Sequence, residues 1–181
     1  MEPQRYTANR SQSVWTIGPR YSTIEFNIKN LFFMKVSGSF SDFSGTVLLD
    51  EDDLSRSSVG ATIKAASIST GIKRRDAHLR SADFLDADKY PEIRFQSVRV
   101  ERGRDRDTLR VAVTLTIKDR SREVVLNILE TDRSRSPQGD EVAYYTALTE
   151  IDRFDFGVNY GRGLIGRTIK VTAQVQAIKQ L

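Results

Sequence analysis

The stretch SISTGIKRRDAHLRSADFLDADKYPEIRFQS, residues 67–97, decides the fold, because it interrupts a run of alternating strands with a charged segment of helical character. Thr70 is expected to cap the start of a helix, since threonine is among the preferred residues there. Tyr90 and Pro91 end the segment, because proline lacks the N–H that continues a helix and disfavours a helical residue before it. We therefore expect residues 67–90, named the cover segment below, to lie over a sheet rather than within it.

The cover segment contains few apolar side chains. Leu79 lies in the expected helix, and Phe84 and Leu85 lie in a second short turn that opens at Ser81 or Asp83. A cover implies a structure beneath it, and the flanking sequence indicates what that structure is.

The flanking sequence has the two-residue period of β-strands. Ile24, Phe26 and Ile28 alternate with polar residues, as expected for a sheet with one face in water. The pattern predicts about eight strands, with a bend or bulge at Gly18-Pro19, kinks at Gly38 and Gly45 and a bulge near Ser97; they cover residues 14–29, 36–50, 59–65, 93–100, 109–117, 124–129, 142–151 and 168–179.

Consecutive strands with one apolar face must pack against a second sheet or close on themselves. A closed barrel of about eight strands is either filled by side chains or leaves room for one small ligand. Ala173 and Ala177 are small residues on the apolar face of the last strand, which favours the second arrangement. The sequence therefore predicts an all-β protein, an extended antiparallel eight-stranded barrel with a short helical insertion capping one end.

Three segments fall outside the strands. Residues 1–13 are polar and without period, so we expect a flexible lead-in. The apolar cluster Leu31–Met34 is expected to plug one end of the barrel. Residues 151–166, IDRFDFGVNYGRGLIG, are expected to form a loop dense in aromatic residues and glycine.

The chain has 181 residues, a net charge of +4 and no cysteine. Its length suits one domain, which we place at 14–181. Without cysteine, no disulfide, thiolate metal site or thiol nucleophile can form. No apolar run is long enough for a secretory signal or a membrane span, so a cytoplasmic location is expected. Acidic residues interrupt the basic stretch 99–106, which argues against nucleic-acid binding.

Several motifs of the chain occur together, and in the same order, in one family. They are WTIGPRYSTIEFNIKNL at 15–31, VSGSFSDFSGTV at 36–47, SIST at 67–70, RDAHLRSADFLDADKYPEIRFQS at 75–97, LTI at 115–117 and IDRFDFGV at 151–158. On these motifs the sequence resembles the YceI-like family of lipocalin-like, polyisoprenoid-binding proteins from Trp15 to Lys179.

The resemblance implies an eight-stranded barrel, covered at one end by the helix, with an apolar tunnel that holds an isoprenoid or similar long-chain lipid. Many relatives carry a secretory signal, and this sequence shows none. The chain also has Val113 and Asp119 where relatives usually have glycine. Because Val113 lies on the apolar face, the resemblance implies a narrower tunnel at that point.

The resemblance turns apolar residues that would otherwise be ordinary core into candidate ligand contacts. These are Phe26, Ile28, Phe40, Phe43, Val47, Ile63, Leu79, Phe84, Phe95, Val113, Leu115, Phe156, Ala173 and Val175. His78 and Arg153 are candidate contacts for a polar head group. Each also has a structural interpretation: His78 as a hydrogen-bonding residue within the cover segment, and Arg153 as a satisfied buried charge that pairs with the cover segment.

The leading hypothesis is a non-enzymatic protein that binds, stores or transports a polyisoprenoid or isoprenoid quinone-like lipid, without a cofactor or a metal. The alternative is an enzyme acting on an isoprenoid or other apolar substrate, with Asp76, His78 and Arg153 near the tunnel mouth. Residues 124–129 and 142–151 are apolar on both faces, which predicts a homodimer through the outer wall. Beyond the lipid ligand, we expect at most a transient contact with a membrane surface.

Overall fold

The computed structural model describes residues 11–30, 32 and 34–181, and strands dominate this part of the chain. Its only α-helix is α1 (Lys73–Arg80), and three short 3-10 helices are η1 (Leu54–Arg56), η2 (Ala65–Ser67) and η3 (Arg153–Phe156). The strands are β1 (Gln12–Ile17), β2 (Thr23–Lys29), β3 (Lys35–Phe40), β4 (Phe43–Asp50), β5 (Ser58–Lys64), β6 (Ile68–Ser69), β7 (Glu92–Arg102), β8 (Thr108–Ile117), β9 (Arg120–Arg135), β10 (Glu141–Asp152) and β11 (Thr168–Lys179).

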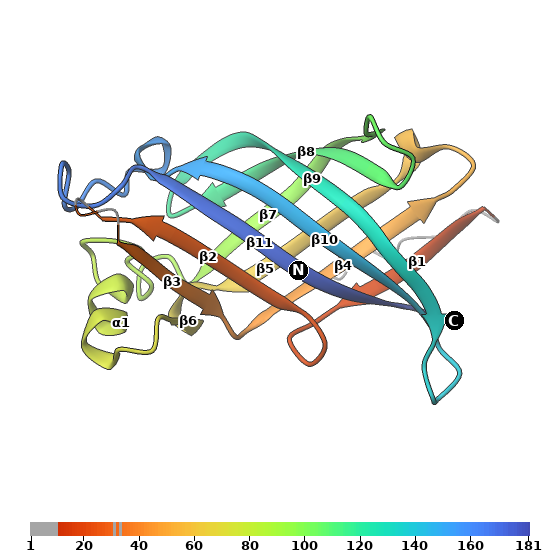
Figure 1. Ribbon diagram of the computed structural model, residues 1–181, viewed down its shortest axis with the longest axis horizontal. Helices are drawn as coiled ribbons and strands as arrows, with labels where there is room; N and C mark the ends of the chain where they lie inside the picture. The colour runs from red at the N-terminus through yellow and green to blue at the C-terminus, as the bar shows by residue number, and fades with distance from the viewer. Residues whose placement is uncertain (1–10, 31, 33) are drawn as a thin grey trace.

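The strands form a closed antiparallel barrel of eight positions, as the sequence predicts (Figure 1). β1 and β2 lie end to end along β11, and β4 and β3 lie end to end as their partners on the other side. These four strands therefore fill two positions, and β5 and β7 to β11 fill the other six, with the two-residue β6 added beside β3. α1 and the loop between β10 and β11 lie at one end, named the cap end below.

The seam where β11 meets the first two strands is not continuous. β1 pairs with the end of β11 through Trp15 and Thr16, and β2 takes over from Thr23. Between them, the buried hydroxyl of Ser22 accepts a hydrogen bond from the backbone N–H of Gln176 at 2.9 Å and donates to the carbonyl of Gln176 at 3.5 Å. At this point of the barrel wall, the Ser22 side chain therefore takes the place of the backbone hydrogen bonds between neighbouring strands.

Two predicted strand features need correction and one is confirmed. The predicted strand 36–50 is broken at Ser41 and Asp42 rather than kinked at its glycines, which lie inside β3 and β4. β1 begins at Gln12, inside the predicted lead-in, of which residues 1–10 lie outside the described part of the chain. The bulge expected near Ser97 is present as a shift in register between Ser97 and Arg99.

The cover segment begins its helix later than predicted. α1 starts at Lys73 after Ile72, and Thr70 is therefore not its N-cap. Instead, the backbone N–H and the hydroxyl of Thr70 both donate to a carboxylate oxygen of Asp76, at 2.8 and 2.5 Å. The prediction was wrong because threonine serves here as donor to a helix side chain instead of as acceptor from the helix backbone.

The predicted plug at Leu31–Met34 is also wrong for the residues that can be described. The side chains of Phe32 and Met34 are 78% and 64% exposed, so they point away from the barrel interior. Leu31 and Phe33 lie outside the described residues. The core is formed instead by inward-facing strand residues together with Phe84 and Ala87 of the cover segment. No helix among the residues described has the length and apolar character needed to cross a membrane.

Candidate functional site

A cavity of about 530 Å³ lies inside the barrel and is lined by residues of nearly every strand. This volume is within the range of small-molecule sites, roughly 300–1,000 Å³. Because side chains alternate between the two faces of a strand, every second residue points inward. On β8, for example, Val111, Val113 and Leu115 all line the cavity.

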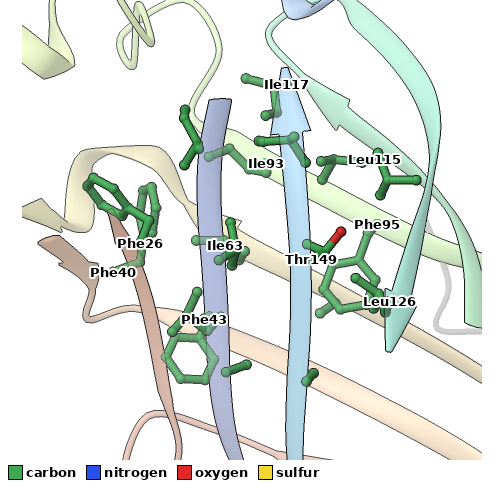
Figure 2. A pocket seen from close by; sticks show the side chains of 18 of the residues that line it. Phe26, Phe40, Phe43, Ile63, Ile93, Phe95, Leu115, Ile117, Leu126 and Thr149 are labelled. Atoms are coloured by element: carbon green, nitrogen blue, oxygen red, sulfur yellow. The ribbon is translucent and has the colours of Figure 1, made fainter. Parts of the chain in front are cut away.

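Each apolar residue proposed from the sequence as a ligand contact lines this one cavity. Figure 2 shows part of the wall, in which Phe26 and Phe40 of neighbouring strands lie together, at 5.7 Å between ring centroids, while Phe95 and Leu115 lie on another side. The complete set is Phe26, Ile28, Phe40, Phe43, Val47, Ile63, Leu79, Phe84, Phe95, Val113, Leu115, Phe156, Ala173 and Val175. The same inward faces add residues that the sequence analysis did not name, such as Ile24, Val171 and Ile169.

The polar side chains that β10 contributes to the cavity lining are satisfied or neutral. The hydroxyl of Thr149 donates to the carbonyl of Val125 at 2.8 Å. Burial raises the pKa of Tyr145 to about 12, so its phenol stays protonated at neutral pH. The sequence analysis missed both residues because β10 carries apolar residues on both faces, which obscures its alternation, although the inward period Tyr145, Ala147, Thr149 is uninterrupted.

The charged lining residues of the described chain are cations near the cap end. They are Lys29, Arg75 and Arg153, and no carboxylate joins them in the lining. Lys29 is exposed and so is the lining residue Tyr160, which marks this end as a place where the cavity reaches the surface. Arg75 is bound within the cover segment, where Nε and Nη2 donate to the hydroxyl and carbonyl of Thr70.

His78, on helix α1 of the cover segment, faces the β10–β11 loop. Its Nε2 lies 2.8 Å from Oδ2 of Asp83, and its ring meets the rings of Phe84 and Tyr160 edge-on, at 5.0 and 4.8 Å between centroids. His78 therefore joins the cover segment to the β10–β11 loop by ring packing, and it remains partly exposed, so a polar group at the cavity rim can reach it.

Arg153 is buried and organises the β10–β11 loop. Its Nε donates to the carbonyl of Gly166 at 2.8 Å, and its Nη1 donates to the carbonyls of Val158 and Tyr160, each at 2.8 Å. Nη2 donates to the carbonyl of Ile165 at 3.2 Å. A guanidinium has five N–H donors, so the loop takes up most of them and leaves little for a head group. The partner is this loop and not, as considered from the sequence, the cover segment.

The structure does not bring Asp76, His78 and Arg153 into one reactive group. Asp76 is buried against Thr70 and does not line the cavity, whereas His78 and Arg153 do. The hydrogen bond from the Thr70 hydroxyl lowers the pKa of Asp76, which keeps it ionised and structural. Within the described residues, no three His, Asp or Glu side chains lie together as they do in a metal site.

The barrel end opposite the cap end, named the far end below, is filled by packed side chains. Trp15, Leu49, Ala143 and Ala177 form a buried cluster there. Ala177 belongs to this cluster and does not line the cavity, so the sequence-based view that it makes room for a ligand was wrong. Ala173, four residues earlier on β11, does line it.

In a comparison with known protein families, residues 15–177 match the YceI-like domain. A UPF0312 protein of Pectobacterium atrosepticum is 32% identical over 89% of this chain and 83% of its own length, and the protein YceI of Shigella flexneri is 30% identical over the same shares.

Solved structures share the fold. BcnA of Burkholderia cenocepacia superposes with a TM-score of 0.79 at 20% identity, covering 88% of this chain and 98% of BcnA. A polyisoprenoid binding domain from Saccharophagus degradans superposes with a TM-score of 0.68 at 14% identity, covering 94% of this chain and 99% of that domain. At such identities these two show the fold alone. The domain match over nearly the whole chain and the 32% identity establish that this protein is a member of the YceI-like family.

Proposed function

We propose that this protein is a non-enzymatic carrier or store for a long-chain apolar lipid, a polyisoprenoid or an isoprenoid quinone-like molecule. The observation that carries the proposal is the cavity itself, whose wall is formed mostly by apolar side chains and whose charged lining residues are confined to one end. The likeness of the fold to a polyisoprenoid binding domain supports the same reading.

The binding force is the removal of the lipid chain from water. Burial of apolar surface contributes about 25 cal/mol per Å², so a long hydrocarbon chain is held without any charged contact. The cavity suits such a chain because Thr149 and Tyr145 offer it no free charge. Selectivity would then come from the length and shape of the cavity between the rings at the cap end and the packed cluster around Trp15.

A polar end of the ligand would lie at the cap end. His78 is the better candidate for contact, because its ring is partly exposed at the rim while the guanidinium of Arg153 is engaged by loop carbonyls.

Replacing His78 by Asn tests the enzymatic alternative as well. A carrier would retain its lipid and form no product, whereas an enzyme that depends on His78 would lose a pH-dependent turnover.

The experiment that tests the proposal is mass spectrometry of the purified protein, first in its native state and then after extraction with organic solvent, beside a mock purification. The proposal expects a long-chain lipid in stoichiometric amount that is absent from the mock. A protein that is empty and takes up no added polyprenyl lipid contradicts it. The cytoplasmic location expected from the sequence stays a prediction.

A further inference from the structure

Exposed apolar side chains gather at the cap end, on three segments that surround the cavity rim. Phe32 and Met34 lie between β2 and β3, Ile72 precedes α1, and Tyr160 and Leu164 lie in the β10–β11 loop. Figure 1 places these three segments at the same end of the barrel. Large apolar side chains on exposed turns are costly in water, so their gathering at one end calls for an explanation.

The three segments form one continuous surface, named the cap rim below, which consists of residues 29, 30, 32, 34 and 35, residues 70–75 and residues 159–167. Asn30 forms a β-bridge with Ile165, and the backbone N–H of Gly166 donates to the carbonyl of Lys29 at 2.7 Å. These contacts join the β2–β3 turn to the β10–β11 loop. The rings of His78 and Tyr160, 4.8 Å apart, join α1 to the same loop.

The cap rim is also purely cationic. Its sequence contains no Asp or Glu, and its cations are Lys29, Lys35, Lys73, Arg74, Arg75, Arg162 and Arg167. Arg167 pairs with Asp152 and Arg75 is bound to Thr70. No carboxylate in the described part of the chain forms an ion pair with the other five, all of which are exposed.

The far end has a different character. The β4–β5 connection begins with Asp50, Glu51, Asp52 and Asp53, and residues 103–107 between β7 and β8 alternate in charge. The small net charge of the chain therefore hides an asymmetry, since the unpaired cations and the exposed apolar tips coincide at the end where the cavity reaches the surface.

We propose that the cap rim docks onto an anionic lipid bilayer. Apolar tips such as Phe32 and Leu164 enter the boundary between head groups and acyl chains, and the cations around them pair with anionic head groups, a combination typical of proteins that bind membrane surfaces. The partner is identified by this charge complementarity. Docking in this orientation sets the cavity rim against the bilayer. The proposal stands on the surface alone and holds whatever the cavity contains.

The first test is co-sedimentation of the purified full chain with vesicles. We expect binding to phosphatidylcholine vesicles that contain about a third phosphatidylglycerol, and weak binding to phosphatidylcholine alone. The double variants Phe32→Ser/Leu164→Ser and Lys35→Glu/Arg162→Glu should each lower the affinity at least ~10-fold, because each removes one of the two attractions. Phe32, Arg162 and Leu164 are exposed on turns, and Lys35 is the exposed first residue of β3. Circular dichroism checks that the variants remain folded.

A matched control is the double variant Arg104→Glu/Arg106→Glu in the β7–β8 turn at the far end, which changes the net charge equally. It should bind the anionic vesicles nearly as well as the wild type. Equal loss in this control, equal binding of the wild type to neutral and anionic vesicles, or no vesicle binding at all would overturn the proposal. The last result would leave a protein partner as the occupant of the cap rim.

A second test reports the orientation. Because the chain has no cysteine, a fluorophore that is sensitive to its surroundings can be attached at a single introduced residue. The emission of the label at Leu164→Cys should shift to shorter wavelength when anionic vesicles are added, and the emission of the label at Arg106→Cys should not. Equal shifts at both positions, or none at Leu164→Cys, would overturn the proposed orientation.

Discussion

Phe26 lies directly over Gly38 on the neighbouring strand, so closely that a Cβ built on Gly38 would be 2.5 Å from Cζ of the ring. The same Cβ would be 2.8 Å from the carbonyl oxygen of Ser69. Gly38→Ala must therefore displace both the ring and β6. We expect a loss of about 1–3 kcal/mol in the free energy of unfolding, measured in urea.

Gly18→Ala is the control for this substitution. No atom lies within 4 Å of a Cβ at Gly18, so its stability should change by less than ~0.5 kcal/mol. Equal losses of stability in Gly38→Ala and Gly18→Ala would mean that the close contact of Phe26 with Gly38 does not exclude a larger residue at position 38.

Ala173→Phe should reduce the amount of bound long-chain lipid. Ala173 lines the cavity, and a ring there would fill part of the space that the chain occupies. Gln174→Phe adds the same ring to the exposed face of the same strand and should retain the lipid. The measurement is the ratio of lipid to protein after extraction, and full occupancy in a folded Ala173→Phe variant would count against the lipid-binding proposal.

Asp76→Asn should destabilise the protein at neutral pH, with a difference that disappears in acid. The hydrogen bond from Thr70 lowers the pKa of Asp76 in the folded state, so the stabilisation is present above the unfolded pKa of about 3.9 and is lost as pH falls through the folded pKa. Urea unfolding of both proteins from pH 7 downwards measures the difference. A difference that stays constant, or that grows in acid, contradicts this role for the carboxylate.

Arg153→Met should loosen the β10–β11 loop, because it leaves four loop carbonyls without their donor. We expect a loss of at least ~3 kcal/mol in stability. Hydrogen exchange in residues 158–166 should become faster in Arg153→Met than in the wild type. The exchange rates of Arg153→Lys should lie between those of the wild type and Arg153→Met, since an ammonium cannot reach all four carbonyls. Unchanged exchange in Arg153→Met would show that the loop does not depend on the guanidinium.

The predicted homodimer would use Leu129 and Leu148, the exposed large apolar residues on the outer wall of β9 and β10. Sedimentation velocity should detect a dimer that Leu129→Ser/Leu148→Ser converts to monomer. Val98→Ser, at an exposed position on β7, is the control and should leave the dimer intact. A wild-type protein that is monomeric at high concentration rules this interface out.

The sequence was sufficient for the barrel and for much of the cavity wall. A two-residue period determines which face of a strand turns inward, and in Leu109–Ile117 this period is uninterrupted. The residues named from such periods, together with Phe84 and Leu79 of the cover segment, therefore line one space.

The wrong predictions concern residues whose type is compatible with more than one position in the structure. The apolar character of Phe32 and Met34 predicts interior residues, but on a turn between two strands these side chains are exposed. Ala173 and Ala177 look alike in the sequence, and only the distance along β11 separates the cavity wall from the cluster around Trp15. The break at Ser41 and Asp42 carries neither glycine nor proline, and its only signal is the preference of serine and aspartate for turns, which the sequence analysis did not use.

Ser22 has a consequence for how the barrel excludes water. Its hydroxyl satisfies both backbone groups of Gln176 at the point where the ladder along β11 is missing, and Ser22 also lines the cavity. Had the seam been left open, water would solvate those groups and reach the apolar interior through the side wall. The closure of the side wall against water therefore depends on one hydroxyl group as well as on the continuity of the sheet.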